Sequence, residues 1–204
     1  PRINLADLYA ATEPGNTRKL IETYEQVLEV DSTHRGAQYA LGRLMLGQGE
    51  TGSALAYLEQ ASQDPRNPQP EKLLGDLYVA QSDLKQARGH YHQALEKAPG
   101  FVPAWLALAE TYASNGDVNM ARAEVTKGAE AVPLSPLLWY VKGIYAQKAG
   151  DKAEAEAAYR KAIELAPDFA PAYNNLAWLL YLESNDLAIA KQFAEKAVEL
   201  VPGN

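Results

Sequence analysis

Three histidines are the side chains best suited to acid–base or metal chemistry at neutral pH. His90 and His92 flank Tyr91 in a segment with helical spacing. Residues two apart on a helix point in different directions, so these two do not form a metal-binding pair. We interpret both as exposed residues of a helix surface. His34 lies between two helical segments and has no obvious partner in the sequence, so the histidines predict neither a metal site nor a catalytic site.

The carboxylates and glycines give no stronger signal of chemistry. Glu154 and Glu156 stand at ordinary helix-surface spacing among Lys and Arg, which is typical of a solvated face. The glycines of GQGETG (residues 47–52) fit a turn between helices better than a nucleotide loop. There is no cysteine, and the motifs HExxH and GxSxG are absent. We therefore predict that these residues form no enzyme and bind no cofactor or metal.

Composition narrows the class of partner. The net charge of −7 argues against nucleic acid, because phosphate binding requires a surplus of Lys and Arg. The hydrophobic fraction of 47% is sufficient for a sizeable core. No window of 18 consecutive apolar residues is present, so we predict no direct insertion into a membrane. The chain begins at Pro1 without a targeting segment, and we expect it to be part of a longer protein.

Regularly spaced prolines and small residues reveal an internal repeat. Successive prolines stand 34, 34, 34 and 35 residues apart, each after an apolar, Ala-rich run that it ends: Pro65, Pro99, Pro133, Pro167 and Pro202. A series of alanines recurs at 33, 34, 34 and 35 residues: Ala54, Ala87, Ala121, Ala155 and Ala190. A third series precedes each alanine by about a dozen residues: Gly42, Gly75, Ala109, Gly143 and Ala177. Short Gly/Ser/Asp breaks between the last two series predict two helices per repeat.

The repeat resembles the tetratricopeptide repeat, whose pattern is Trp-x2-Leu-Gly-x2-Tyr, then Ala, an aromatic residue and Pro. Residues 105–121 (WLALAETYASNGDVNMA) reproduce its first half, and residues 150–167 (GDKAEAEAAYRKAIELAP) reproduce its second half. Lys142 departs from the pattern where Leu is expected, and Glu71 where an aromatic residue is expected. The resemblance implies an all-α fold, a right-handed α-solenoid (superhelix) of antiparallel helix pairs.

Six repeats account for the whole length. We predict one solenoid domain over 1–204, with repeats at about 1–33, 34–67, 68–101, 102–135, 136–169 and 170–204. The first repeat is the weakest match, because its closing proline is missing. Its first helix is expected around residues 5–9 and its second helix over LIETYEQVLEV.

The resemblance also implies a concave groove lined by the first helix of each repeat. Carried onto this chain, the groove positions are Tyr39, Arg43, Lys72, Asp76, Leu106, Glu110, Tyr140, Ile144, Gln147, Asn174, Trp178 and Tyr181. The Lys, Asn and Arg set that related proteins use for chaperone C-termini is not found, because Asp76 stands where Asn is needed. The C-terminal half is rich in apolar and aromatic groove residues. We therefore expect a partner peptide with apolar anchors, although packing against a following segment would also explain Trp178.

These features predict a scaffold that binds a protein or peptide and assembles a multiprotein complex. Two alternatives remain, a regulatory or substrate-presenting arm of an enzyme and a carrier that holds a ligand or lipid in the aromatic groove. The chain is also similar, more weakly, to bacterial tetratricopeptide proteins of cell-envelope and exopolysaccharide-export systems, which implies a periplasmic or envelope location rather than a cytoplasmic one. Phe193, Val198 and Leu200 lie on the last predicted helix, so the C-terminal edge is a candidate surface for self-association.

Overall fold

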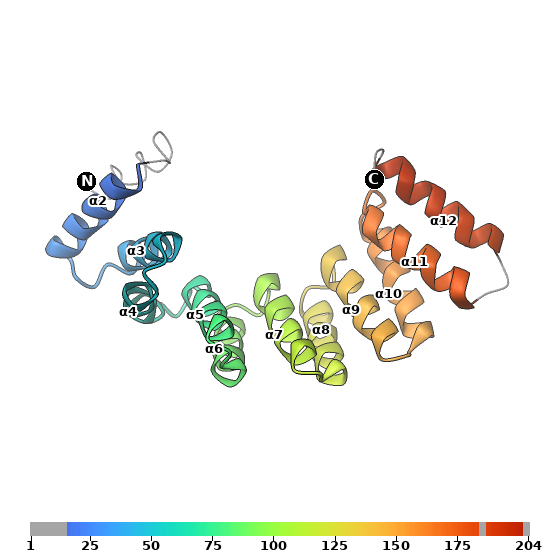
Figure 1. The fold of residues 1–204 in the computed structure, drawn as a ribbon, viewed down its shortest axis with the longest axis horizontal. Coiled ribbons are helices and arrows are strands. Elements are labelled where there is room, and N and C mark those ends of the chain that lie inside the picture. The colour runs from blue at the N-terminus through green and yellow to red at the C-terminus, as the bar shows by residue number, and fades with distance from the viewer. Residues whose placement is uncertain (1–15, 184–186, 202–204) are drawn as a thin grey trace. The chain divides into compact units, whose positions relative to one another are not determined.

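The computed structural model describes residues 16–183 and 187–201, and every regular element in these ranges is an α-helix (Figure 1). Contacts divide the chain into two compact units, residues 1–104 and 105–204. The first unit contains α2 (Thr17–Val30), α3 (Arg35–Gln48), α4 (Thr51–Ala61), α5 (Gln69–Ala80) and α6 (Leu84–Lys97). Helix α7 (Val102–Ser114) begins at the end of the first unit and continues in the second, which also contains α8 (Val118–Ala131), α9 (Pro136–Lys148), α10 (Lys152–Leu165), α11 (Ala170–Glu183) and α12 (Leu187–Leu200). The predicted all-α class is confirmed.

Helices pack as consecutive pairs. Helix α3 packs on α4 and α5 on α6 in the first unit, and α9 packs on α10 and α11 on α12 in the second (Figure 1). Each of these pairs lies within one predicted repeat. The expected helix around residues 5–9, the turn at 184–186 and Pro202 fall outside the described residues. That all six repeats form one solenoid domain stays a prediction.

The four predicted turns that lie in the described residues are present, and two local devices recur in them. One residue of each turn, at the end of the first helix or within two residues of it, adopts a positive φ: 79° at Gly49, 64° at Ser82, 84° at Gly116 and 82° at Gly150. After three of these turns an aspartate caps the second helix. Asp83, Asp117 and Asp151 each accept a hydrogen bond from the backbone N–H three residues later, at 3.0, 3.1 and 3.1 Å. The Gly-Asp or Ser-Asp pair therefore stops one helix and starts the next.

Small residues allow the paired helices to approach closely. Ala121 and Ala155 have no exposed surface. At Gly143 of α9, a Cβ atom would lie 2.5 Å from the ring of Tyr159 on α10, closer than van der Waals contact allows. Gly143 and Tyr159 thus form a small–large pair, and Gly42 and Leu58 form another, in which the corresponding distance is 2.7 Å. The small residues predicted from their spacing mark these crossings.

Helix α2 shows that the weakest repeat still contributes to the core. Leu20, Tyr24 and Val27 of α2 pack in one cluster with Leu41 and Met45 of α3. The loop between the two helices is fixed by His34, whose Nδ1 accepts a hydrogen bond from the Ala37 N–H at 3.1 Å. The interpretation of His34 as a residue without a partner is therefore wrong, because it caps α3.

Candidate functional site

Helix α11 is apolar on nearly every side and buries only part of that surface. Leu176, Leu179 and Leu180 are buried, whereas Trp178 and Tyr181 are each 56% exposed. The rings of Trp178 and Tyr181 stack on each other, with centroids 5.7 Å apart and planes 30° from parallel. Two large aromatic rings held in water by a rigid helix form a surface suited to binding, since covering them releases ordered water.

A hollow of about 260 Å³ lies beside this aromatic pair, between α9 and α11. Its lining consists of Ile144, Gln147, Lys148, Tyr159, Asn175 and Trp178, and we call it the α9–α11 hollow. The hydroxyl of Tyr159 donates a hydrogen bond to Oε1 of Gln147 at 2.8 Å. Burial raises the pKa of Tyr159 to about 12, so this hydroxyl stays protonated and remains a donor. The structure thus brings together three predicted groove residues, Ile144, Gln147 and Trp178.

The other groove residues predicted in the second unit are placed differently. Tyr140 is half-buried, with its ring edge-on to Phe169 at 5.2 Å and its hydroxyl accepting a hydrogen bond from Asn175 at 3.3 Å. It therefore supports the packing of α11 and is not an open contact residue. On α7, Leu106 is half-buried and Glu110 is exposed.

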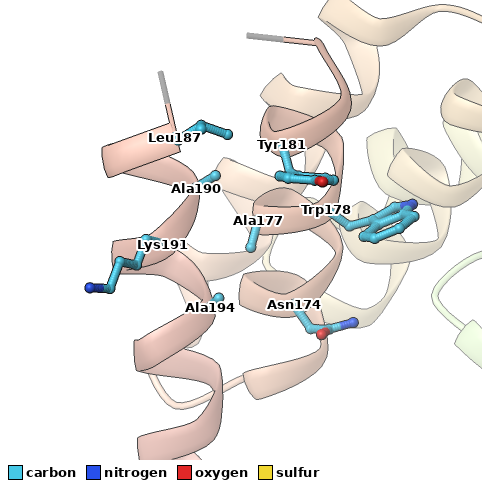
Figure 2. A pocket seen from close by; sticks show the side chains of 8 residues that line it. All are labelled: Asn174, Ala177, Trp178, Tyr181, Leu187, Ala190, Lys191 and Ala194. Carbon is cyan, nitrogen blue, oxygen red and sulfur yellow. The ribbon is translucent and has the colours of Figure 1, made fainter. Parts of the chain in front are cut away.

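A second hollow, of about 490 Å³, separates α11 from α12 (Figure 2). It is lined by Asn174, Ala177, Trp178, Tyr181, Leu187, Ala190, Lys191 and Ala194. A third hollow, of about 410 Å³, shares Asn174 and Ala194 with it and extends along the same helix pair to Val198 and Val201. We call this continuous surface the α11–α12 groove. Trp178 points away from α12 in Figure 2, so it lies at the boundary between the groove and the α9–α11 hollow.

Sequence reasoning missed the α12 side of this groove, although the repeat carries a signal for it. The third and fifth repeats place Tyr91 and Tyr159 four residues after the second-helix alanine. The sixth repeat has Ala194 at the same place. In Figure 2 the side chains of Ala190 and Ala194 face Ala177 across the space between the helices. The hollow between α11 and α12 thus lies where the third and fifth repeats have a tyrosine ring.

The groove residues predicted in the first unit mostly interact with each other. Nζ of Lys72 lies 2.7 Å from Oδ2 of Asp76, and Oδ1 of Asp76 accepts a hydrogen bond from the Tyr91 hydroxyl at 2.9 Å. The Tyr39 hydroxyl donates to the side chain of Gln69. The exposed guanidinium of Arg43 lies 5.8 Å from the ring centroid of Tyr39. Because Lys72 and Asp76 neutralise each other, this surface offers less unbalanced charge than the sequence suggested.

A polar hollow of about 650 Å³ in the first unit surrounds Glu71, the residue that replaces the expected aromatic. Oε2 of Glu71 lies 2.8 Å from Nδ1 of His90, and its Oε1 lies 2.7 Å from Nζ of Lys97, which also donates to the carbonyl of Ser62 at 2.5 Å. His90 also stacks on Tyr78 at 5.2 Å. The prediction that His90 is merely exposed is therefore wrong, whereas His92 is exposed as predicted.

These contacts decide the charge state of Glu71. Burial raises the pKa of Glu71, but hydrogen bonds from His90 and Lys97 outweigh that effect and leave it below the ordinary value. The carboxylate is thus ionised and doubly paired. We interpret this cluster as a structural connection between α4, α5 and α6.

The described part of the chain contains no group of three or more His, Cys, Asp or Glu side chains placed to hold a metal ion. Over the same ranges, no helix has the length and apolarity needed to cross a membrane.

Profiles of known families match most of the chain. A tetratricopeptide repeat-like domain matches residues 4–101, and tetratricopeptide repeats match residues 78–143, 136–169 and 158–192. Among characterised proteins, human protein O-mannosyl-transferase TMTC1 is 24% identical over 98% of this chain, which spans 23% of that protein's length.

Solved structures share the fold. PilF of Pseudomonas aeruginosa superposes with a TM-score of 0.74 at 18% identity, covering 100% of this chain and 91% of that one. The tetratricopeptide protein YrrB, described as having an unusual peptide-binding site, superposes with a TM-score of 0.62 at 22% identity, covering 86% of this chain and 90% of that one. At such identities these likenesses establish the fold alone. The profile matches, together with the helix pairs, the turns and the 34-residue period, identify the chain as a member of the tetratricopeptide-repeat family, whose α-solenoid fold is typical of protein-interaction scaffolds.

Proposed function

We propose that this chain is a scaffold that binds an apolar segment of a partner protein at the α9–α11 hollow. The observation that carries the proposal is the exposure of Trp178 at the mouth of that hollow, stacked on Tyr181. Binding hot spots are typically aromatic side chains that become desolvated in a pocket surrounded by polar groups. The partner segment inserts an apolar side chain beside Trp178 and Ile144 and covers both.

Polar groups around the hollow supply orientation. Gln147 and Asn175 line it, and exposed Lys148 adds one positive charge. Oε1 of Gln147 already accepts from the Tyr159 hydroxyl, so its amide N–H2 is the group that faces a ligand. The surface therefore favours a segment that has an apolar anchor and a carbonyl or carboxylate oxygen close to it. The peptide-binding site named for YrrB is consistent with such a role on this fold.

A second candidate function is an arm that presents a substrate to, or regulates, an enzyme. The name of TMTC1, a mannosyl-transferase of which the matching region is less than a quarter, favours it. Assembly of an envelope or secretion complex, and a periplasmic or envelope location, stay predictions that cell fractionation tests. Self-association through α12 also stays a prediction.

Site-specific photo-crosslinking in the native host tests the proposal directly. A photoreactive phenylalanine analogue replaces Lys148, an exposed residue that lines the hollow, or, as the matched control, Val30 of α2, which is 75% exposed and distant in sequence. We expect one protein to crosslink from position 148 and not from position 30. Equal crosslinking from both positions, or none from position 148, would contradict the proposal.

A further inference from the structure

The α11–α12 groove corresponds to a surface that is already occupied elsewhere in the same unit. In the preceding repeat, α9 and α10 present their equivalent face to α11. Leu176, Leu179 and Leu180 of α11 pack there against Ala155 and Tyr159 of α10. This face of a helix pair therefore receives a helix that carries apolar residues at positions i, i+3 and i+4.

The fifth and sixth repeats differ at two equivalent positions, and these differences make the α11–α12 groove wider than the corresponding space between α9 and α10. Tyr159 has no exposed surface and fills the space beside Gly143. The equivalent residues of the last repeat are Ala194 and Ala177, so a tyrosine ring is lost and only one methyl group is gained. Figure 2 shows these alanines facing each other across the open groove. An occupant must bring a large side chain of its own to fill that space at interior density.

The chemistry of the walls favours a helix over an extended peptide. Both walls are α-helices, whose backbone N–H and C=O groups are paired internally along most of their length. An extended segment would lose hydration of its backbone without finding partners, whereas a helix carries its backbone hydrogen bonds with it. Lys191 is the one charged residue among the eight that line the wider hollow, and its side chain points away from α11 (Figure 2). The floor itself is apolar.

We infer that the α11–α12 groove binds an amphipathic helix of a partner protein, with apolar residues at i, i+3 and i+4, one of them aromatic. The aromatic side chain enters the space between Ala177 and Ala194, where the third and fifth repeats hold their own tyrosine. This surface is separate from the α9–α11 hollow, and Trp178 is the one residue that borders both.

The probe is a set of soluble 16-residue helical peptides, labelled for fluorescence anisotropy, that keep the leucine spacing of α11 and have Glu and Lys elsewhere. Three peptides each carry Phe at one of the apolar positions, and a fourth carries Ala at all three. We expect at least one Phe peptide to bind the wild-type chain tenfold or more tightly than the all-Ala peptide. Failure of all three to exceed it would overturn the inference.

Ala194→Tyr restores the ring that the third and fifth repeats carry. It should weaken the best Phe peptide at least tenfold while the melting temperature stays equal or rises. Ala194→Lys serves the same purpose if tyrosine perturbs the pair, since Ala194 is exposed and the helix tolerates lysine. The matched control, Ala188→Tyr, adds the same ring to an exposed position of α12 outside the lining and should leave binding unchanged.

Unchanged affinity in both Ala194 variants would overturn the inference. Sedimentation of the wild-type chain adds a second arm. A dimer that Ala194→Tyr abolishes and Ala188→Tyr leaves intact would assign the groove to a second copy and would also overturn it. None of these outcomes depends on the α9–α11 hollow, so the groove can fail while the proposed function stands.

Discussion

The pair α9–α10 and the pair α11–α12 are built from the same repeat, yet one is sealed and the other is open. In the sealed pair Tyr159 fills the space beside Gly143 and α11 covers both helices. In the open pair alanines stand at both places, and the space between the helices remains. The size of the residue at one position of the second helix thus decides whether a helix pair has a packed core or an open surface that a ligand can fill.

The same comparison shows how a repeat exchanges one kind of contact for another. In the third repeat, Glu71 of the first helix meets His90 of the second through a hydrogen bond of 2.8 Å. In the sixth repeat, Tyr173 and Phe193 at the equivalent positions meet through their rings, 6.0 Å apart. The same helix pair accommodates either kind of side-chain contact, so these two positions can differ in chemistry from repeat to repeat.

The largest expected effect follows from removing the residue that seals α9–α10. Tyr159→Ala should lower the free energy of unfolding by about 3–5 kcal/mol, because a fully buried ring and its hydrogen bond to Gln147 are lost. Urea denaturation followed by circular dichroism measures the change. A loss below about 1 kcal/mol would mean that the ring does not hold the pair together.

The charged contact of the third repeat is expected to respond to acid. The pKa of Glu71 lies below its ordinary value of 4.5, so its stabilising effect is complete above that pH and is lost as the pH falls further. Glu71→Gln should cost about 1.5–3 kcal/mol at neutral pH, since His90 and Lys97 lose a charged acceptor.

Wild type should lose the contribution of Glu71 in acid, whereas Glu71→Gln has no such contribution to lose. Melting temperatures of wild type and Glu71→Gln should converge as the pH falls below 4.5. Glu59 and Glu96 line the same hollow and remain in both proteins, so they do not produce the difference. A gap between the two proteins that stays constant with pH would show that Glu71 acts through packing instead.

A smaller and sharper comparison uses one substitution at two equivalent alanines. Ala155→Leu should destabilise the chain by about 1–3 kcal/mol, because Ala155 is fully enclosed between packed helices. Ala190→Leu should cost less than about 1 kcal/mol, since the new side chain can extend into the groove that Ala190 lines. Equal losses in thermal or urea unfolding would show that the groove is not open enough to accept a side chain.

The smallest expected effect on stability is that of Trp178→Ala. More than half of the indole surface is already in water, so the free energy of unfolding should change by less than about 1 kcal/mol. A much larger loss would indicate that Trp178 belongs to the core, which is the packing alternative left open by the sequence.

The fold could be predicted from the sequence because its determinants are local and recur. Proline spacing, the small residues at helix crossings and the Gly-Asp or Ser-Asp turns each repeat with the 34-residue period, and every one acts within a single helix pair. The family resemblance also predicted Ile144, Gln147 and Trp178 as groove residues, and the structure places all three in the lining of one hollow. That this hollow binds a partner stays a prediction.

The parts that sequence reasoning missed depend on which partner each side chain finds. His90 looked exposed until Glu71, 19 residues earlier, was placed beside it. Lys72 and Asp76 looked like groove charges, but they pair with each other. Ala194 carried a readable signal, a missing aromatic residue, yet its meaning depends on the space that the two helices leave open.

The affinity of the crosslinked partner for the Trp178→Ala variant tests the central claim most directly. The purified partner is titrated by calorimetry into the wild-type chain, into Trp178→Ala and into the exposed control Val30→Ala, after circular dichroism has shown equal helicity. We predict that Trp178→Ala weakens binding about 30-fold or more, the effect of losing a hot-spot aromatic residue, while Val30→Ala binds as wild type does. Equal affinity of all three proteins would contradict a binding site at the α9–α11 hollow.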